Sequence, residues 1–211
     1  IELSELSDDN WNLQNFSMNK LFLKAFHNDK TIEELGNAWY GIVTGADSVF
    51  IFEQEDYDNS DIEKDLCLPL LRAQSCWRYY CEKAEKYVLY PYKYEDGDTI
   101  LLSPNELESF YPNGWKYLLE HRKELESRKD SRSTFEGRDD WYSLTRFVQK
   151  KIFNRDKIVT PGEVKGHKFC IDKSKAGYSG ARVFGITIDE LFGRPKPESV
   201  KEECSHEKIS I

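Results

Sequence analysis

The stretch from Tyr111 to Arg146 reads YPNGWKYLLEHRKELESRKDSRSTFEGRDDWYSLTR, and the rest of the chain is best interpreted around it. Its first half has apolar residues at helical spacing, namely Trp115, Leu118, Leu119 and Leu125. This periodicity predicts one amphipathic helix over roughly 115–129. The helix is expected to begin after the turn signal Pro112-Asn113-Gly114, with Asn113 capping its first turn.

The second half of the stretch combines arginines with aromatic residues. A planar guanidinium suits phosphate oxygens and guanine edges, and its interleaving with aromatic rings is typical of nucleic-acid contacts. The residues concerned are Arg128, Arg132, Arg138, Trp141, Tyr142 and Arg146. A charged helix face alone is more typical of a solvated surface, and aromatic pairs such as Trp141-Tyr142 are more often found in a core. Both interpretations stay open at this point.

Shorter segments on either side predict strands and brief helices. Trp39–Val43 and Ser48–Phe52 suggest a hairpin, and Glu53–Asp65 suggests a solvated acidic loop. Ser103-Pro104-Asn105-Glu106 is a capping box that opens a short helix ending at Phe110. Further β-rich segments are Leu66–Leu71, Trp77–Cys81, Tyr87–Tyr92, Lys157–Thr160, His167–Ile171 and Arg182–Ile188. The mixture predicts an α+β fold, with a mixed or antiparallel sheet packed against a few helices.

Several of these segments together resemble the C-terminal specificity domain of TaqI-like adenine-specific DNA methyltransferases and of fused restriction–modification enzymes. The resemblance extends roughly from Trp11 to Ile188. Two positions depart from the family pattern: Asp156 replaces a usual proline, and Cys76-Trp77 replaces a small polar and an aliphatic residue. The matching segments, in family order, are Trp39–Phe52 (WYGIVTGADSVFIF), Leu68–Tyr80 (LPLLRAQSCWRYY), Lys86–Tyr92, Asn113–Leu118, Trp141–Arg146 and Lys157–Pro161.

The resemblance implies a target recognition domain over residues 17–192, similar in fold to the methylase specificity domains. Residues 1–16 would be a connector from an N-terminal catalytic domain, and 193–211 a linker or disordered tail. The chain starts at Ile1 and not at Met, so we expect it to be part of a longer protein. The implied partners are double-stranded DNA and the protein's own methyltransferase domain. That domain would hold S-adenosylmethionine, and no cofactor is expected in this chain.

The same interpretation gives a set of candidate DNA-binding residues. Arg138, in the polar turn 130–140, is the expected base reader, and Arg146 is expected to contact phosphate or support the framework. Arg72 and Arg78, beside predicted strands, could equally form ordinary ion pairs with the acidic first half of the chain. The complete set is Arg72, Arg78, Arg128, Arg132, Arg138, Trp141, Tyr142, Arg146, Lys150 and Lys151.

The charge of the chain is unevenly distributed. The net charge is −8, which on its face opposes binding to a polyanion. Residues 1–114 carry 9 Lys and Arg against 22 Asp and Glu, whereas residues 115–182 carry 17 against 10. The second segment is therefore the expected DNA face. The acidic segment supports an alternative function, a non-catalytic protein-interaction domain that binds a basic partner.

The five cysteines have no repeating spacing, which argues against a disulfide framework and for the reducing cytoplasm. A zinc site using the pairs His167/Cys170 and Cys204/His206 is conceivable but not favoured, since the resembled family offers none. The chain has neither a Pro-Pro pair nor a G-x-G-x-x-G turn, so we expect no catalytic residues. No apolar run approaches the ~20 residues that span a bilayer, so no membrane partner is expected.

Overall fold

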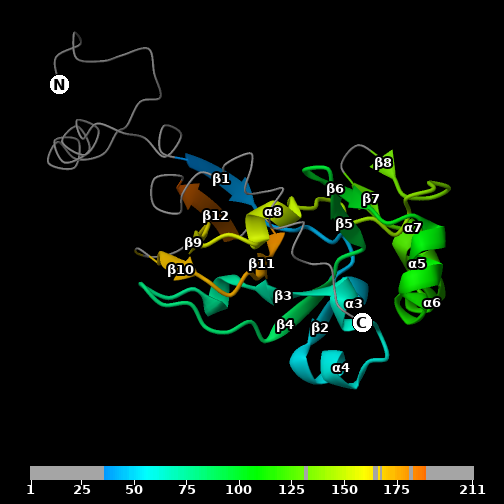
Figure 1. Cartoon of the computed structure of the whole chain (residues 1–211), viewed down its shortest axis with the longest axis horizontal. Helices are drawn as coiled ribbons and strands as arrows, with labels where there is room; N and C mark the ends of the chain where they lie inside the picture. Colours follow the sequence, from blue (N-terminus) through cyan, green and yellow to red (C-terminus); the bar gives the residue numbers. More distant parts are fainter. Residues whose placement is uncertain (1–35, 131–132, 164–165, 167, 181–182, 189–211) are drawn as a thin grey trace, which may run out of the picture.

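The computed structural model describes residues 36–130, 133–163, 166, 168–180 and 183–188. The expected connector at 1–16 and the expected tail at 193–211 lie outside these ranges. Within them the chain forms two four-stranded sheets, two short hairpins and a set of short helices. Figure 1 shows how these elements are arranged. The α+β class expected from the sequence, with mostly antiparallel sheets, is confirmed.

The first sheet is antiparallel throughout and joins the earliest described strand to the latest. Its edge strands are β1 and β10, and β1 pairs with β12 in a register that places Tyr40 opposite Phe184. The indole nitrogen of Trp39 donates a hydrogen bond to the Thr187 hydroxyl across this pair at 3.3 Å. In spatial order the strands are β1 (Gly36–Tyr40), β12 (Val183–Ile188), β9 (Lys157–Pro161) and β10 (Cys170–Asp172).

The second sheet contains the one parallel pair among the described strands, β11 with β3. It meets the first sheet at Tyr178 of β11, whose ring lies so close to Gly185 of β12 that a Cβ there would collide with it. Small residues at this crossing therefore let the two sheets share one core. In spatial order the strands are β11 (Gly177–Tyr178), β3 (Cys67–Leu71), β4 (Lys86–Leu89) and β2 (Ile51–Glu53).

The helices gather mainly at the end of the molecule away from β10 (Figure 1). Ser103 and Glu106 form the predicted capping box at the start of α5, which ends at Phe110 as expected. The helical segments are α3 (Asp47–Phe50), α4 (Gln54–Asn59), η2 (Lys64–Leu66), η3 (Ala73–Ser75), α5 (Pro104–Phe110), α6 (Pro112–Glu120), α7 (Arg122–Glu126) and α8 (Lys150–Phe153). The hairpins are β5 (Tyr92–Glu95) with β6 (Asp98–Leu101), and β7 (Lys129–Asp130) with β8 (Ser133–Thr134).

The predicted single helix over 115–129 is wrong in two respects. It is broken at His121, where a ψ of 7° ends α6 before α7 begins. Asn113 also does not cap the helix, because α6 starts at Pro112 and a side chain from another segment accepts hydrogen bonds from the first free N–H groups of α6. The backbone N–H groups of Asn113 and Gly114 each donate to the Glu63 carboxylate at 2.9 Å. An acidic side chain at a helix N-terminus is favourable, and here it comes from a distant segment.

Three other local predictions are also wrong. The hairpin expected for 39–52 is absent, because the Thr44 hydroxyl and Asp47 carboxylate hydrogen-bond each other and 47–50 coils into α3. The acidic segment after Glu53 is not simply a loop but forms the exposed helix α4. Trp77–Cys81 is a tight loop and not a strand, since Tyr79 has a φ of 68°. Among the described residues, no helix is both long and apolar enough to cross a membrane.

Candidate nucleic-acid interface

A loop of exposed aromatic residues projects beside the edge strand β10. It comprises Trp77, Arg78, Tyr79 and Tyr80, and we call it the aromatic loop. The exposed fractions of its three rings are 47%, 79% and 59% in sequence order. Large aromatic side chains are costly to expose and are enriched at binding surfaces. The aromatic loop is therefore the first candidate for a binding site.

Backbone contacts hold the aromatic loop in place. The N–H of Trp77 donates to the carbonyl of Tyr80 at 2.9 Å, which closes the turn. The N–H of Tyr79 donates to the carbonyl of Phe169 at 2.8 Å, which attaches the tip of the loop to the chain entering β10. Below the turn, Cys76 and Cys81 face each other as an antiparallel bridge. The rings are thus presented by a fixed backbone and not by a free segment.

Cations accompany these rings. The guanidinium of Arg78 lies 5.1 Å from the centre of the Tyr79 ring and donates to the Tyr79 hydroxyl at 3.2 Å. The ammonium of Lys168 lies 4.5 Å from the centre of the Trp77 ring. Rings stacked with cations combine a surface for bases with charge for phosphates. Arg78 is a sequence-predicted residue that the structure places in an exposed position.

An aromatic row continues from the loop across the first sheet. Side chains on opposite strands share a face when their residues pair, and Tyr40, Phe184 and Thr160 pair in one line across β1, β12 and β9. Extending the register of Cys170 with Val159 by one residue places Phe169 on the same line. Tyr40 and Phe169 are both exposed, and the rings of Tyr40 and Phe184 lie 5.0 Å apart.

Arg146 lies at the far end of this aromatic row. Its backbone pairs with Val43, just after β1, through two hydrogen bonds of 2.9 Å. Its exposed guanidinium lies 5.6 Å from the centre of the Tyr40 ring. The row therefore carries an exposed arginine–aromatic contact at each edge of the same sheet, Arg146 at β1 and Arg78 beside β10.

Three cysteines meet under the aromatic loop. The Sγ atoms of Cys76, Cys81 and Cys170 all lie within 4.8 Å of one another. Cys76 and Cys170 are buried, whereas Cys81 is partly exposed. Hydrogen bonds with Cys76 and Cys81 lower the pKa of the Cys170 thiol, and hydrogen bonds with Cys170 and Cys81 raise the pKa of Cys76. These residues could hold a soft metal ion. The zinc site considered from the sequence also used His167, Cys204 and His206, and these three residues lie outside the described ranges.

A buried ion pair lies on β9 and β10 next to this cluster. The ammonium of Lys157 donates to the Asp172 carboxylate at 2.6 Å, and neither side chain is exposed. The same carboxylate accepts two further hydrogen bonds from Ser174, and burial lowers the pKa of Lys157. Because each polar group of the pair has partners, it orders the strand that carries Cys170 without offering a ligand site.

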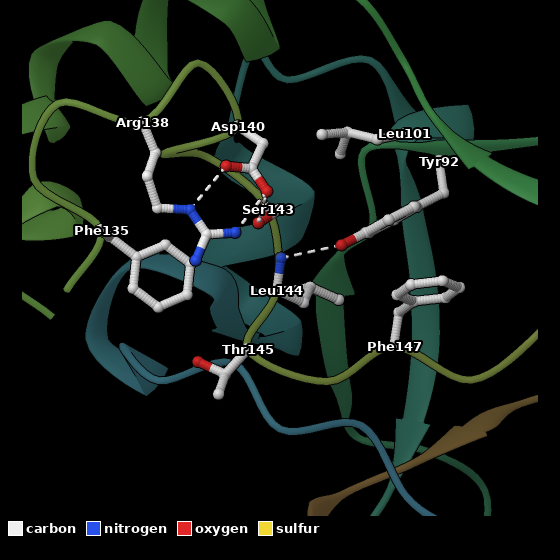
Figure 2. A pocket seen from close by; sticks show the side chains of 9 residues that line it. All are labelled: Tyr92, Leu101, Phe135, Arg138, Asp140, Ser143, Leu144, Thr145 and Phe147. Atoms are coloured by element: carbon white, nitrogen blue, oxygen red, sulfur yellow. Dashed lines mark hydrogen bonds and ion pairs between the residues drawn. The ribbon is translucent and has the colours of Figure 1, made fainter. Parts of the chain in front are cut away.

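A second candidate region is the cavity shown in Figure 2, of about 390 Å³. Arg138 points across its mouth to Asp140, and its Nε and Nη2 atoms donate to the two carboxylate oxygens at 2.7 and 2.6 Å. The guanidinium also lies 4.6 Å from the centre of the Phe135 ring. This bidentate pair lowers the pKa of Asp140 and engages the two nitrogens that would otherwise read a guanine. The expected base-reading role of Arg138 stays a prediction, and it would require this ion pair to open.

Arg128 requires a correction, because it is a buried framework residue and not a surface contact. Only 6% of it is exposed. Its guanidinium donates to four backbone carbonyls and lies 4.1 Å from the centre of the Phe135 ring. The four hydrogen bonds go to Leu125 (2.8 Å), Thr44 (2.7 Å), Ser143 (3.0 Å) and Trp141 (2.5 Å). Burial lowers the pKa of Arg128 to about 10.

Trp141 and Tyr142 are core residues as well. Both are buried, their rings make edge contacts with each other, and both pack against Trp115 of α6. The Tyr142 hydroxyl donates to the carbonyl of Leu102 at 2.7 Å. A ring enclosed in this way cannot stack on a base unless the fold opens. Their suggested contact with DNA is therefore corrected to packing of the helices against the hairpin β5–β6.

The remaining predicted residues are scattered. Arg72 is half-buried and contacts Asp47 at 3.4 Å, as an ordinary ion pair would, and its buried Nε atom has no hydrogen-bond partner among the described residues. Lys150 begins α8, and its backbone N–H donates to the Thr99 hydroxyl at 2.8 Å. Lys151 follows it in α8. Arg132 lies outside the described residues.

The basic segment 115–182 therefore does not form one face. Lys116 and Lys123 lie on α6 and α7 at one end of Figure 1, whereas Lys168 lies next to β10 at the other. Sequence reasoning missed the aromatic loop and its partners Phe169 and Lys168. The available signal was the run CWRYYC, in which three rings and an arginine stand between two cysteines. A scan against models of known protein families finds no match, and a search of curated proteins finds no relative.

Proposed function

We propose that this chain binds double-stranded DNA sequence-specifically, as the target recognition domain of an N6-adenine DNA methyltransferase or a fused restriction–modification enzyme. One observation carries the proposal: a sheet face with the exposed rings of Tyr40 and Phe169 has an arginine–aromatic contact at each edge. The sequence resemblance to methyltransferase specificity domains supports the same function, and its segments Trp39–Phe52 and Leu68–Tyr80 contain Tyr40, Arg78 and Tyr79.

The dimensions of this face suit duplex DNA. β1 and β10 are the outer strands of a four-stranded sheet, so three strand spacings separate them. At ~4.8 Å per spacing this distance is about 14 Å. The major groove of B-DNA is ~12 Å wide, so Arg146 at one edge of the sheet could contact a phosphate beside the groove while the other edge faces the groove itself. The aromatic loop, at the edge of the sheet, would then enter the groove.

Each part of this face has a chemical role in the proposal. Arg146 would contact a phosphate, which fixes the register without reading sequence. Arg78 replaces Arg138 as the proposed base reader, because its guanidinium is exposed on the loop. Trp77 and Tyr79 would stack on bases or wedge between base steps. Such wedging would help a neighbouring catalytic domain to extract its target adenine.

The cofactor would belong to that neighbouring domain. S-adenosylmethionine binding and adenine extrusion need a glycine-rich turn and an Asn/Asp-Pro-Pro-aromatic loop, and the 211 residues contain neither motif. In this proposal the chain supplies recognition, and the methyltransferase domain supplies the chemistry. We expect no methyl transfer from the 211-residue chain alone.

The test is DNA binding by the 211-residue chain. A random duplex pool is enriched on the immobilised protein, and the selected and scrambled duplexes are compared by fluorescence anisotropy at several salt concentrations. Arg146→Ala should weaken binding to both duplexes and reduce the salt slope by about 0.9 per lost phosphate contact. Arg78→Ala should lose ~1–3 kcal/mol of discrimination at one base pair. Lys116→Ala, an exposed lysine on α6, is the matched control and should bind normally.

Two outcomes would contradict the proposal. One is binding that is absent or insensitive to salt, and the other is an equal loss in Lys116→Ala and Arg146→Ala. If DNA does not bind but a basic protein partner does, the alternative function applies. The exposed acidic helix α4 would then be the surface to examine, since Glu55, Asp56 and Asp58 all lie on it.

A further inference from the structure

We propose that Cys76, Cys81 and Cys170 bind a zinc ion that fastens the aromatic loop to strand β10. This proposal does not depend on the DNA-binding function. Its basis is that the three sulfur atoms already converge, each within 4.8 Å of the other two. Zinc binds thiolate sulfur at ~2.3 Å, and tetrahedral angles then separate two sulfurs by about 3.8 Å. A small inward movement of the side chains would therefore complete the three bonds.

The positions of the cysteines in the fold make the convergence specific. Cys76 and Cys81 are held opposite each other by an antiparallel bridge at the base of the loop. Cys170 comes from β10, where it pairs with Val159, and its side chain lies on the inner face of the sheet. The ligands thus come from two segments that are far apart in sequence. An ion shared among them would link these segments.

Backbone hydrogen bonds hold the aromatic loop, but apolar burial adds little to them. Its rings are exposed, so little apolar burial stabilises it, and Tyr79 adopts a positive φ that non-glycine residues rarely tolerate. Such a conformation persists only where its surroundings fix it. A metal site supplies folding free energy directly, as it does in small zinc-binding loops. An ion at this site would add a cross-link to the backbone hydrogen bonds of the loop.

Coordination chemistry favours zinc over harder cations. Three thiolates are soft ligands, which select zinc and exclude magnesium or calcium. Two of the cysteines are buried and Cys81 is partly exposed, so the fourth tetrahedral position would face solvent on the side of Cys81 and take a water molecule. Partial exposure at Cys81 also gives the ion an entry path.

The test measures metal bound to the full 211-residue chain. Protein purified without chelators is assayed for zinc by mass spectrometry, and Cys76→Ser, Cys81→Ser and Cys170→Ser are compared with Cys67→Ser. Cys67 is a buried cysteine in β3 outside the cluster and is the matched control. We expect about one zinc per chain in the wild type and the control, and at least a fivefold loss in each cluster variant.

A second measurement covers variants that fail to fold. Apo wild-type protein titrated with Co²⁺ should develop thiolate-to-cobalt charge-transfer absorption and tetrahedral d–d bands, and added zinc should abolish both. Thiol titration of denatured, unreduced protein should then find all five cysteines free. Zinc retained by the cluster variants, or no cobalt spectrum in the wild type, would overturn the proposal. A disulfide between any two of Cys76, Cys81 and Cys170, found as three titratable thiols and identified by peptide mapping, would also overturn it.

Discussion

Arg128 and Arg78 are both arginines beside aromatic rings, yet one is enclosed and the other is exposed. Arg128 lies 4.1 Å from the Phe135 ring and is 6% exposed, whereas Arg78 lies 5.1 Å from the exposed ring of Tyr79. The difference lies in where the N–H donors go. Four backbone carbonyls satisfy Arg128, while among the described residues Arg78 donates to the hydroxyl of its neighbour Tyr79. An arginine beside an aromatic ring therefore stabilises the fold at position 128, whereas at position 78 it is exposed and accessible to a binding partner.

The largest expected effect comes from removing the buried arginine. Arg128→Leu would leave the carbonyls of Leu125, Thr44, Ser143 and Trp141 without their donor, and unsatisfied buried acceptors cost about 1–3 kcal/mol each. We expect the free energy of unfolding in urea to fall by at least about 4 kcal/mol.

The control for Arg128→Leu is Arg122→Leu in α7. Arg122 is an exposed arginine that also lies beside an aromatic ring, 5.1 Å from Trp141, and pairs with Glu126 at 2.9 Å. An exposed pair of this kind contributes about 0–1 kcal/mol. Equal losses of stability in the two variants would show that burial does not separate the two classes of arginine.

The next effect should appear in binding and not in stability. Trp77→Ala and Tyr79→Ala remove exposed rings, so each should change the free energy of unfolding by no more than about 0.5 kcal/mol. If the rings stack on bases, each loss should weaken DNA binding by ~1–3 kcal/mol. Anisotropy on the selected duplex and urea unfolding give the two values. A large loss of stability with normal binding would show that the aromatic loop stabilises the fold, as Arg128 does, and does not contact DNA.

Arg138 tests the intermediate case. It is half-exposed, paired with Asp140 and stacked near Phe135, so Arg138→Ala should cost about 0–1 kcal/mol of stability. The recognised sequence should stay unchanged, because the proposed reader is Arg78. A relaxed preference at one base pair in Arg138→Ala, with none in Arg78→Ala, would move the reading site to the cavity of Figure 2.

The smallest effect concerns a carboxylate on the surface. Hydrogen bonds from Lys93 and Ser103 lower the pKa of Glu106 from 4.5 to about 2. A lowered pKa stabilises the fold above the unfolded value, and this contribution is lost as pH falls from 4.5 through 2. The difference in melting temperature between wild type and Glu106→Gln should therefore shrink over this interval. A constant difference down to pH 2 would mean that the charge of Glu106 contributes nothing.

Two local signals in the sequence predicted local structure well. In the capping box, Ser103 and Glu106 hydrogen-bond each other and lie within four residues, and α5 forms as expected. The β-branched segment from Lys157 likewise forms the strand β9. The α+β class could be predicted from such segments, because the residues of each segment indicate by themselves whether it is a helix or a strand.

Predictions that depend on distant partners were wrong. Arg128 has the composition of a surface helix residue, and only its contacts with Thr44 and Ser143 reveal that it is buried. Asn113 looks like a cap, but Glu63 provides the acceptor. The aromatic run after Cys76 has strand propensity, but its pairing with Cys81 turns it into a loop. Contacts of this kind have no signature in a single sequence.

The pairing of β1 with β12 also has a consequence for biosynthesis. Tyr40 and Phe184 form the aromatic row only when these strands meet, yet most of the chain is translated between them. Contacts between residues so far apart form late, because a long loop must close first. A nascent chain on the ribosome would carry the aromatic loop but not the completed row. We therefore expect an incomplete translation product to lack the proposed DNA face.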